Sequence, residues 1–267
     1  MQSQLIHPKA SPFSKIQQDI GLTTIMIEYS RPAARGRQIF GGLVPYGRIW
    51  RVGANESTKL SVNSEIEVLE NTLLPGTYAL YAFPEEYSWE VVFHKNTSHW
   101  GDGRTAYDPE EDAFRVHIEP EENSEWQENF LISFDSISHN GAIMKWKWGN
   151  SSVSIPILID TQKEMLQAIE KSLVDHPSAQ TYYEAARYLQ EEGMKSAKAL
   201  QYLEKAIALG GDTYYFYRVK SLVEASMKNY TGAIESAKRS LMLAKAEGKD
   251  EFVRMNQENI ARWKKIK

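Results

Sequence analysis

The feature that most constrains the fold is a change of hydrophobic periodicity near residue 160. From about Leu22 to Ile159, polar and apolar residues alternate in short runs rich in β-branched and aromatic side chains. Such alternation is typical of strands with one buried face. After Asp160 the apolar residues recur at helical spacing among Ala, Leu, Glu and Lys. The chain has 267 residues, enough for two domains. We therefore expect a β-rich domain over 1–160 and a helical domain over 161–267.

Nine runs in the first part predict strands: LTTIMIEY, TKLSV, EIEVL, TYALYAF, SWEVVFH, FRVHI, NFLISFD, AIMKWKW and VSIPILI. In AIMKWKW, the residues Met144, Trp146 and Trp148 share one face and two lysines share the other. This is the pattern of a sheet with one buried side. Short strands without intervening helices predict an antiparallel β-sandwich or an irregular barrel, so the fold class is α+β with segregated domains.

Turn residues and irregular segments separate the strand runs. Asn140-Gly141, between two alternating runs, is a strong hairpin signal. The segment 30–57 is dense in Gly, Pro and Arg, and the segment 107–128 is acidic. Both are expected to contain long loops, where binding groups tend to lie on a rigid sheet.

The helical part repeats itself at a spacing of 34 residues. The windows MLQAIEKSL, ALQYLEKAI and AIESAKRSL begin at Met165, Ala199 and Ala233. A helix-turn-helix period of this length resembles the tetratricopeptide family. The pattern predicts six helices, at 162–174, 178–192, 196–209, 213–227, 230–246 and about 250–265.

Repeat arrays of this kind usually contact other proteins, so we expect a protein or peptide partner on residues 178–246. Aromatic residues on the first helix of each pair either line a binding groove or belong to the helical core. They are Tyr182, Tyr183, Tyr188, Tyr214, Tyr215, Phe216 and Tyr217.

Composition excludes several classes of function. A formal net charge of −4 argues against binding to nucleic acid. No apolar run reaches the roughly 18–20 residues of a transmembrane segment. The chain has no cysteine, which excludes disulfides and thiolate chemistry. We find no Gly-x-Ser-x-Gly nucleophile motif and no phosphate-binding glycine loop. No catalytic residue and no cofactor is therefore predicted.

The segment 30–57 carries the best candidate binding residues. Guanidinium groups beside an aromatic ring suit a small polar ligand or a glycan. The candidates are Arg31, Arg35, Arg37, Trp50, Arg51, Asn55 and Glu56. The alternative is structural: the arginines pair with Glu28, Glu56 and the acidic residues of 108–128 and lock an irregular crossover in place.

Two histidines offer a second, weaker signal. His94 and His99 are five residues apart, with acidic residues nearby. This spacing is not a recognised metal-ligand pattern, so the sequence predicts no metal site. The main hypothesis is a non-enzymatic binding or scaffolding protein. The alternative is a hydrolase acting on carbohydrate or peptide, with Glu56 as acid or base and His94 or His99 as its helper.

Four motifs stand out in the first part of the chain: Tyr29-Ser30-Arg31-Pro32, Arg35-Gly36-Arg37, Phe40-Gly41-Gly42-Leu43-Val44-Pro45 and Trp50-Arg51-x-Gly53-Ala54-Asn55-Glu56. Through these motifs, residues 8–159 resemble a family of uncharacterised, usually exported domains that is common in Bacteroidetes and is catalogued as a domain of unknown function. Some members are fused to tetratricopeptide-like repeats. The resemblance implies a periplasmic or exported protein of the cell envelope, and it implies no reaction. No signal peptide is recognisable at the start of the chain.

Overall fold

The computed structural model describes residues 7–100 and 106–266. The chain divides into two compact units, Met1–Glu164 and Met165–Lys267. The first unit contains antiparallel sheets and the second contains helices, which confirms the α+β class with segregated domains. The division falls within helix α1 (Thr161–Asp175), just past the change of periodicity in the sequence.

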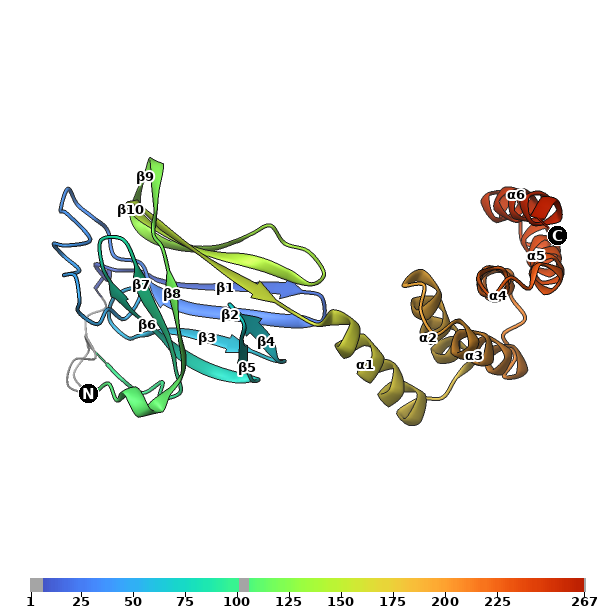
Figure 1. Ribbon diagram of the computed structural model, residues 1–267, viewed down its shortest axis with the longest axis horizontal. Helices are drawn as coiled ribbons and strands as arrows, with labels where there is room; N and C mark the ends of the chain where they lie inside the picture. The colour runs from blue at the N-terminus through green and yellow to red at the C-terminus, as the bar shows by residue number, and fades with distance from the viewer. Residues whose placement is uncertain (1–6, 101–105, 267) are drawn as a thin grey trace. The chain divides into compact units, whose positions relative to one another are not determined.

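The described part of the first unit contains ten strands in two sheets. Six strands form one sheet, in the order β1 (Phe13–Ile20), β2 (Thr23–Ser30), β3 (Thr58–Val62), β6 (Gly76–Pro84), β7 (Trp89–His94) and β8 (Asp112–Ile118). Four form the other, in the order β5 (Asn71–Leu73), β4 (Ile66–Val68), β10 (Gly141–Leu158) and β9 (Glu121–Asp135). All neighbouring strands are antiparallel. The two sheets face each other (Figure 1) and share one core, so the unit is a sandwich.

Alternation along the strands determines which side chains enter the shared core. Ile25 and Ile27 of β2, Phe93 of β7, and Met144 and Trp146 of β10 are all fully buried there. The lysines between the buried residues of β10 are only half-buried. The predicted faces of AIMKWKW are thus confirmed. The predicted hairpin at Asn140-Gly141 is also confirmed, because β9 and β10 pair directly across it.

The strand pattern of the sequence differs from the structure at three places. Strands β1 and β5 were not predicted: β1 is a polar edge strand and β5 is only three residues long. The segment 121–128, expected to be loop, belongs to β9. The last two predicted strands are one strand, β10, in which Gly149 has a φ of +61° and lies at a register shift. A glycine bulge, rather than a turn, separates the two runs.

The second unit contains six helices in its described part, and their bounds agree with the predicted ones within two residues. After α1 they are α2 (Ala179–Glu191), α3 (Ser196–Ala208), α4 (Tyr214–Ser226), α5 (Tyr230–Ala246) and α6 (Asp250–Ile266). The oxygens of Ser178 and Asn229 accept hydrogen bonds from Thr181 N and Gly232 N, so α2 and α5 have N-caps. This helical arrangement is compatible with the predicted repeats. None of the helices in the described residues is long and apolar enough to cross a membrane.

The aromatic residues of the helical unit contribute mainly to its core. Tyr183 of α2 and Phe216 of α4 are buried, and their rings stack with centroids 4.5 Å apart and an interplanar angle of 3°. Tyr182, Tyr188 and Tyr215 are only partly buried and pack against the same core. The interpretation as core residues therefore holds for Tyr183 and Phe216.

Candidate functional site

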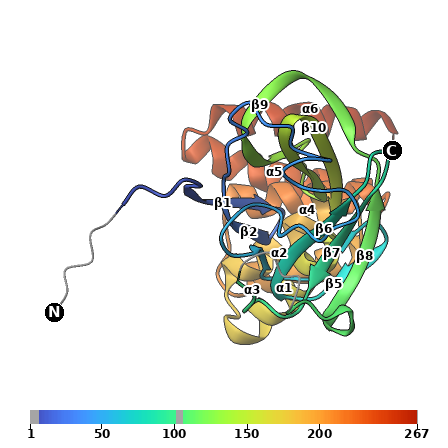
Figure 2. The ribbon, with the colours of Figure 1, turned by 90° about the vertical axis from the view of Figure 1, so that its left-hand side faces the viewer.

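The segment 31–57 crosses the end of the sandwich that faces the viewer in Figure 2, where it is drawn in blue. Its backbone is held in unusual conformations, since Arg35, Val52 and Asn55 have φ values of 52°, 53° and 64°. Positive φ is most unfavourable for a β-branched residue and costs about 1–3 kcal/mol. Val52 is nevertheless fully buried, and its carbonyl accepts a hydrogen bond from Thr58 Oγ1. The surrounding structure thus imposes a defined shape on this segment.

A cavity of about 540 Å³ lies within this segment, inside the usual size range of small-molecule sites. Four arginines line it: Arg35, Arg37, Arg48 and Arg51. None of the described residues that line the cavity is acidic. The others are Ala10, Ser11, Pro32, Ala33, Leu43, Val44, Pro45, Ile49, Trp50, Gly53, Ala54 and Trp148.

Backbone carbonyls hold two of the predicted arginines in place. Arg37 donates from Nε to the carbonyl of Ala34 at 2.9 Å and from Nη2 to that of Ala33 at 2.8 Å. Arg31 donates from Nε to the carbonyl of Phe130 at 2.8 Å, and it does not line the cavity. A carbonyl orients a guanidinium without neutralising its charge, so Arg37 keeps its charge beside the cavity.

One acidic residue of the predicted acidic segment, Glu128, lies close to Arg35 and Arg37. Glu128 Oε1 accepts a hydrogen bond from the backbone N of Arg35 at 2.8 Å, and Oε2 accepts one from Trp126 Nε1 at 3.0 Å. The pKa of Glu128 is lowered, first by the Trp126 hydrogen bond, then by that of Arg35, and further by the charges of Arg35 and Arg37. Glu28, another expected partner, pairs with a lysine of β1 instead.

Trp50 is a buried structural residue and not an exposed aromatic surface on which a ligand could stack. It is 6% exposed, and its Nε1 donates to the carbonyl of Gly53 at 3.2 Å. Its ring stacks on Trp148, with centroids 6.0 Å apart, and meets Phe40 and Phe130 edge-on. Trp50 and Trp148 therefore form a rigid apolar floor under the arginines.

Besides Arg31, two more of the predicted site residues, Asn55 and Glu56, lie away from the cavity. Asn55 Nδ2 donates to Ser30 Oγ at 3.0 Å, so its side chain braces the segment. Glu56 is exposed, and its backbone forms an isolated bridge with Trp100. The structure thus brings together Arg35, Arg37, Trp50 and Arg51. The cavity also contains two residues that were not among the candidates: Arg48, an arginine of the same segment, and Trp148 of β10.

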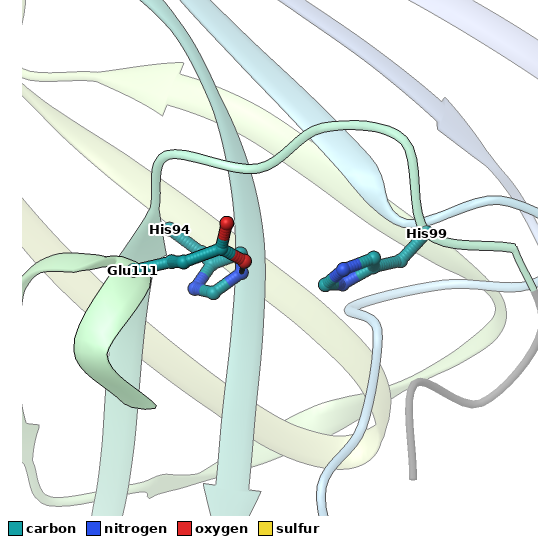
Figure 3. A group of neighbouring side chains, drawn as sticks. All are labelled: His94, His99 and Glu111. Atoms are coloured by element: carbon teal, nitrogen blue, oxygen red, sulfur yellow. Dashed lines mark ion pairs between the residues drawn. The ribbon is translucent and has the colours of Figure 1, made fainter. Parts of the chain in front are cut away.

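A second cluster lies on the outer face of the six-stranded sheet. Strand alternation places His94 and Val92 of β7, with Tyr81 of β6, on the face opposite the sandwich core. His94, His99 and Glu111 each offer a ligand atom, and these atoms lie within 4.8 Å of one another. Figure 3 shows the Glu111 carboxylate beside the His94 ring and the His99 ring directed toward both.

A polar network surrounds His94. Asp112 Oδ1 lies 2.8 Å from His94 Nδ1. Tyr107 Oη donates to Asp112 Oδ2 at 2.8 Å, and Arg115 Nε donates to the same oxygen at 2.7 Å. Arg115 also donates from Nη1 to Glu90 at 2.8 Å. Burial and the hydrogen bond to Asp112 raise the pKa of Tyr107, so the phenol remains protonated. Asp112 is therefore fixed as an acceptor for the imidazole.

His99 is buried beside Tyr81, whose Oη lies 3.1 Å from His99 Nδ1. Burial, and then the neighbouring His94, hold the pKa of His99 below its usual value. The carboxylate of the cluster belongs to Glu111, in the short helix η1 (Pro109–Glu111). Glu56, the acid or base of the hydrolase hypothesis, is not part of the cluster; its backbone forms a bridge with Trp100, next to His99. The pairing of His94 with Asp112 in neighbouring strands brings Glu111 next to His94. The spacing of these residues along the sequence does not indicate this contact.

These features define a class of protein: an antiparallel sandwich with an arginine-lined cavity at one end, in a chain that continues into a helical array. Residues 11–157 match the family described as a protein of unknown function (DUF2911). The match covers more than half of the chain, so the chain belongs to this family. Comparison with curated proteins and with solved structures found no match.

Proposed function

We propose that this protein is a non-enzymatic binding protein whose sandwich holds a small anionic molecule in the arginine-lined cavity. The observation that carries the proposal is the cavity of about 540 Å³ with four arginines and no acidic residue among its described lining. An anion supplies the negative charge that this lining lacks. Guanidinium groups recognise phosphate and carboxylate through paired hydrogen bonds.

The floor of the cavity restricts the ligand further. Trp50, Trp148 and Leu43 are apolar lining residues on the same cavity as the arginines. A ligand with an anionic group and an apolar body would contact both parts, since most small-molecule sites combine apolar walls with a few polar groups. A glycan fragment that carries a phosphate or a carboxylate satisfies the same chemistry.

A thermal-unfolding assay with phenyl phosphate, phenol and inorganic phosphate tests this function. Phenyl phosphate is expected to stabilise the protein more than either of the other two, because it alone combines the charge with the ring. Ligand at 100 times its Kd adds about 2.7 kcal/mol to the free energy of unfolding. The double variant Arg35→Ala/Arg48→Ala is expected to lose at least about tenfold in affinity, because each charged hydrogen bond contributes about 1.5–3 kcal/mol.

The matched control is Arg187→Ala, which removes an exposed arginine of α2 that pairs with Glu191. Its affinity for phenyl phosphate should equal that of the unaltered protein. Equal stabilisation by phenol and by phenyl phosphate, or equal affinity in the double variant and the control, would contradict the proposal.

For the helical unit we propose contact with a protein or peptide partner on residues 178–246. Support comes from the 34-residue spacing and from partly buried tyrosines such as Tyr202 and Tyr217. A photo-crosslinking amino acid at either position is expected to capture one defined partner in cells. The same amino acid at the exposed Tyr87, in the sandwich, should not capture it. Crosslinking at Tyr87 alone would contradict the assignment of the partner to residues 178–246.

The proposal places the protein in the cell envelope, as a periplasmic or exported protein. This location is what the resemblance of residues 8–159 to usually exported domains implies. Fractionation of the native cells, followed by immunodetection of the protein, is expected to recover it outside the cytoplasm. Recovery in the cytoplasmic fraction alone would contradict the location and leave the cavity's chemistry unaffected.

A further inference from the structure

The cluster on the outer face of the six-stranded sheet uses none of the residues that line the arginine cavity. We infer that His94, His99 and Glu111 bind a divalent transition-metal ion, with Zn²⁺ as the ion the donor set fits well. Two imidazoles and one carboxylate are a ligand set that holds Zn²⁺ and leaves a fourth position open. The inference goes beyond the anion-binding function and does not depend on it.

The ligand atoms of the cluster need to move only slightly closer together to coordinate one ion. His94 Nε2 lies 3.5 Å from Glu111 Oε2. Ligand atoms about 2.0–2.1 Å from a tetrahedral ion are roughly 3.4 Å apart, so this pair already has the required spacing. All three ligand atoms lie within 4.8 Å of one another. The side chain of Glu111 is 42% exposed, and its two oxygens accept hydrogen bonds from Asn96 Nδ2 at 3.3 and 3.0 Å, which hold the carboxylate beside His94.

A buried nitrogen without a hydrogen-bond partner indicates a ligand at this position. His94 is completely buried, and its Nε2 has no hydrogen-bond partner among the described residues. Buried polar atoms are almost always hydrogen-bonded, and an exception calls for a specific explanation. Nε2 is also the atom that faces Glu111. A metal ion between these two atoms would satisfy the nitrogen and neutralise the carboxylate.

The other nitrogen of each imidazole is already occupied, as in protein metal sites. His94 Nδ1 lies 2.8 Å from Asp112 Oδ1, and His99 Nδ1 lies 3.1 Å from Tyr81 Oη. With a proton on Nδ1, His94 directs the lone pair of Nε2 away from Asp112 and toward the cluster. A carboxylate behind a ligating histidine fixes its tautomer and increases its basicity. Tyr107 and Arg115 in turn fix Asp112.

Titration calorimetry of chelator-treated, tag-free, full-length protein with ZnCl₂ tests the site. We expect one Zn²⁺ per chain. His99→Ala and Glu111→Gln should each weaken binding on the order of 100-fold, because each removes a direct ligand. Asp112→Asn should weaken it about 10- to 100-fold through the orientation of His94. His94→Ala is not used, because removal of this buried side chain threatens folding.

His117→Ala is the matched control, since His117 lies on the adjacent strand β8 and its side chain is 74% exposed. Its affinity for Zn²⁺ should be unchanged. The visible spectrum of the Co²⁺ complex should show the strong absorption of a tetrahedral ion, and His99→Ala should lose it. Absence of Zn²⁺ binding by the unaltered protein would overturn the inference. So would binding that survives both His99→Ala and Glu111→Gln in folded variants.

Discussion

Replacement of Trp50 by alanine is expected to lower the free energy of unfolding of the sandwich by about 3–5 kcal/mol, the usual cost of a large aromatic residue lost from a core. Trp50 is 6% exposed and contacts the rings of Phe40, Trp89, Phe130 and Trp148. Its truncation would leave a cavity lined by rings from both sheets. Urea unfolding followed by far-UV circular dichroism measures the loss.

Trp100→Ala is the matched control, because Trp100 is 72% exposed. Exposed substitutions usually change stability by about 0.5 kcal/mol or less. The comparison also separates two roles of Trp50. If Trp50 were chiefly a platform for the ligand, Trp50→Ala would unfold at the same urea concentration as Trp100→Ala and lose only ligand affinity. That result would contradict the packing described above.

In the helical unit, Phe216→Ala is expected to lower stability by about 3–5 kcal/mol. Phe216 stacks on Tyr183 at 4.5 Å and touches Tyr215 edge-on at 4.9 Å. The preceding turn packs so closely that a Cβ on Gly211 would lie 2.1 Å from the Phe216 ring. Hydrogen exchange of the amides in α2 and α4 measures the change as a lower free energy of opening.

Met242→Ala, at a half-exposed position of α5, is the control for this measurement. Its amides in α2 and α4 should keep their protection. Unchanged protection of both helices in Phe216→Ala would mean that the stacked pair lies outside the stabilising core of this unit. In that case the groove interpretation of these aromatic residues would be the better one.

Much of the fold follows from periodicity, because burial on one face is a local property of the sequence. Helix α5 was expected at 230–246 and is Tyr230–Ala246. The alternation in AIMKWKW correctly assigned its buried and outward faces. Prediction from the sequence failed where contacts with neighbouring strands determine the structure. Strand β1 is a polar edge strand that is ordered by its pairing with β2. The Gly149 bulge keeps β10 continuous through residues that have the composition of a turn.

The candidate sites were less accessible to sequence reasoning, because they depend on contacts between distant residues. Four of the seven candidates, including Arg35 and Arg51, line the cavity, and composition of one loop was sufficient to find them. Trp148 completes the floor from the opposite sheet. Glu111 joins His94 and His99 only because β8 pairs with β7. No spacing rule within the chain encodes such a pairing.

The most direct test of the central claim is a titration of the ¹⁵N-labelled protein with phenyl phosphate, followed through the arginine Nε–Hε resonances in NMR spectra. The account predicts saturable shifts of Arg35, Arg37 and Arg48, which line the cavity, and unchanged signals from Arg187 of the helical unit. Binding that leaves the cavity arginines unshifted and moves other arginines instead would contradict the assignment of the anion site to this cavity.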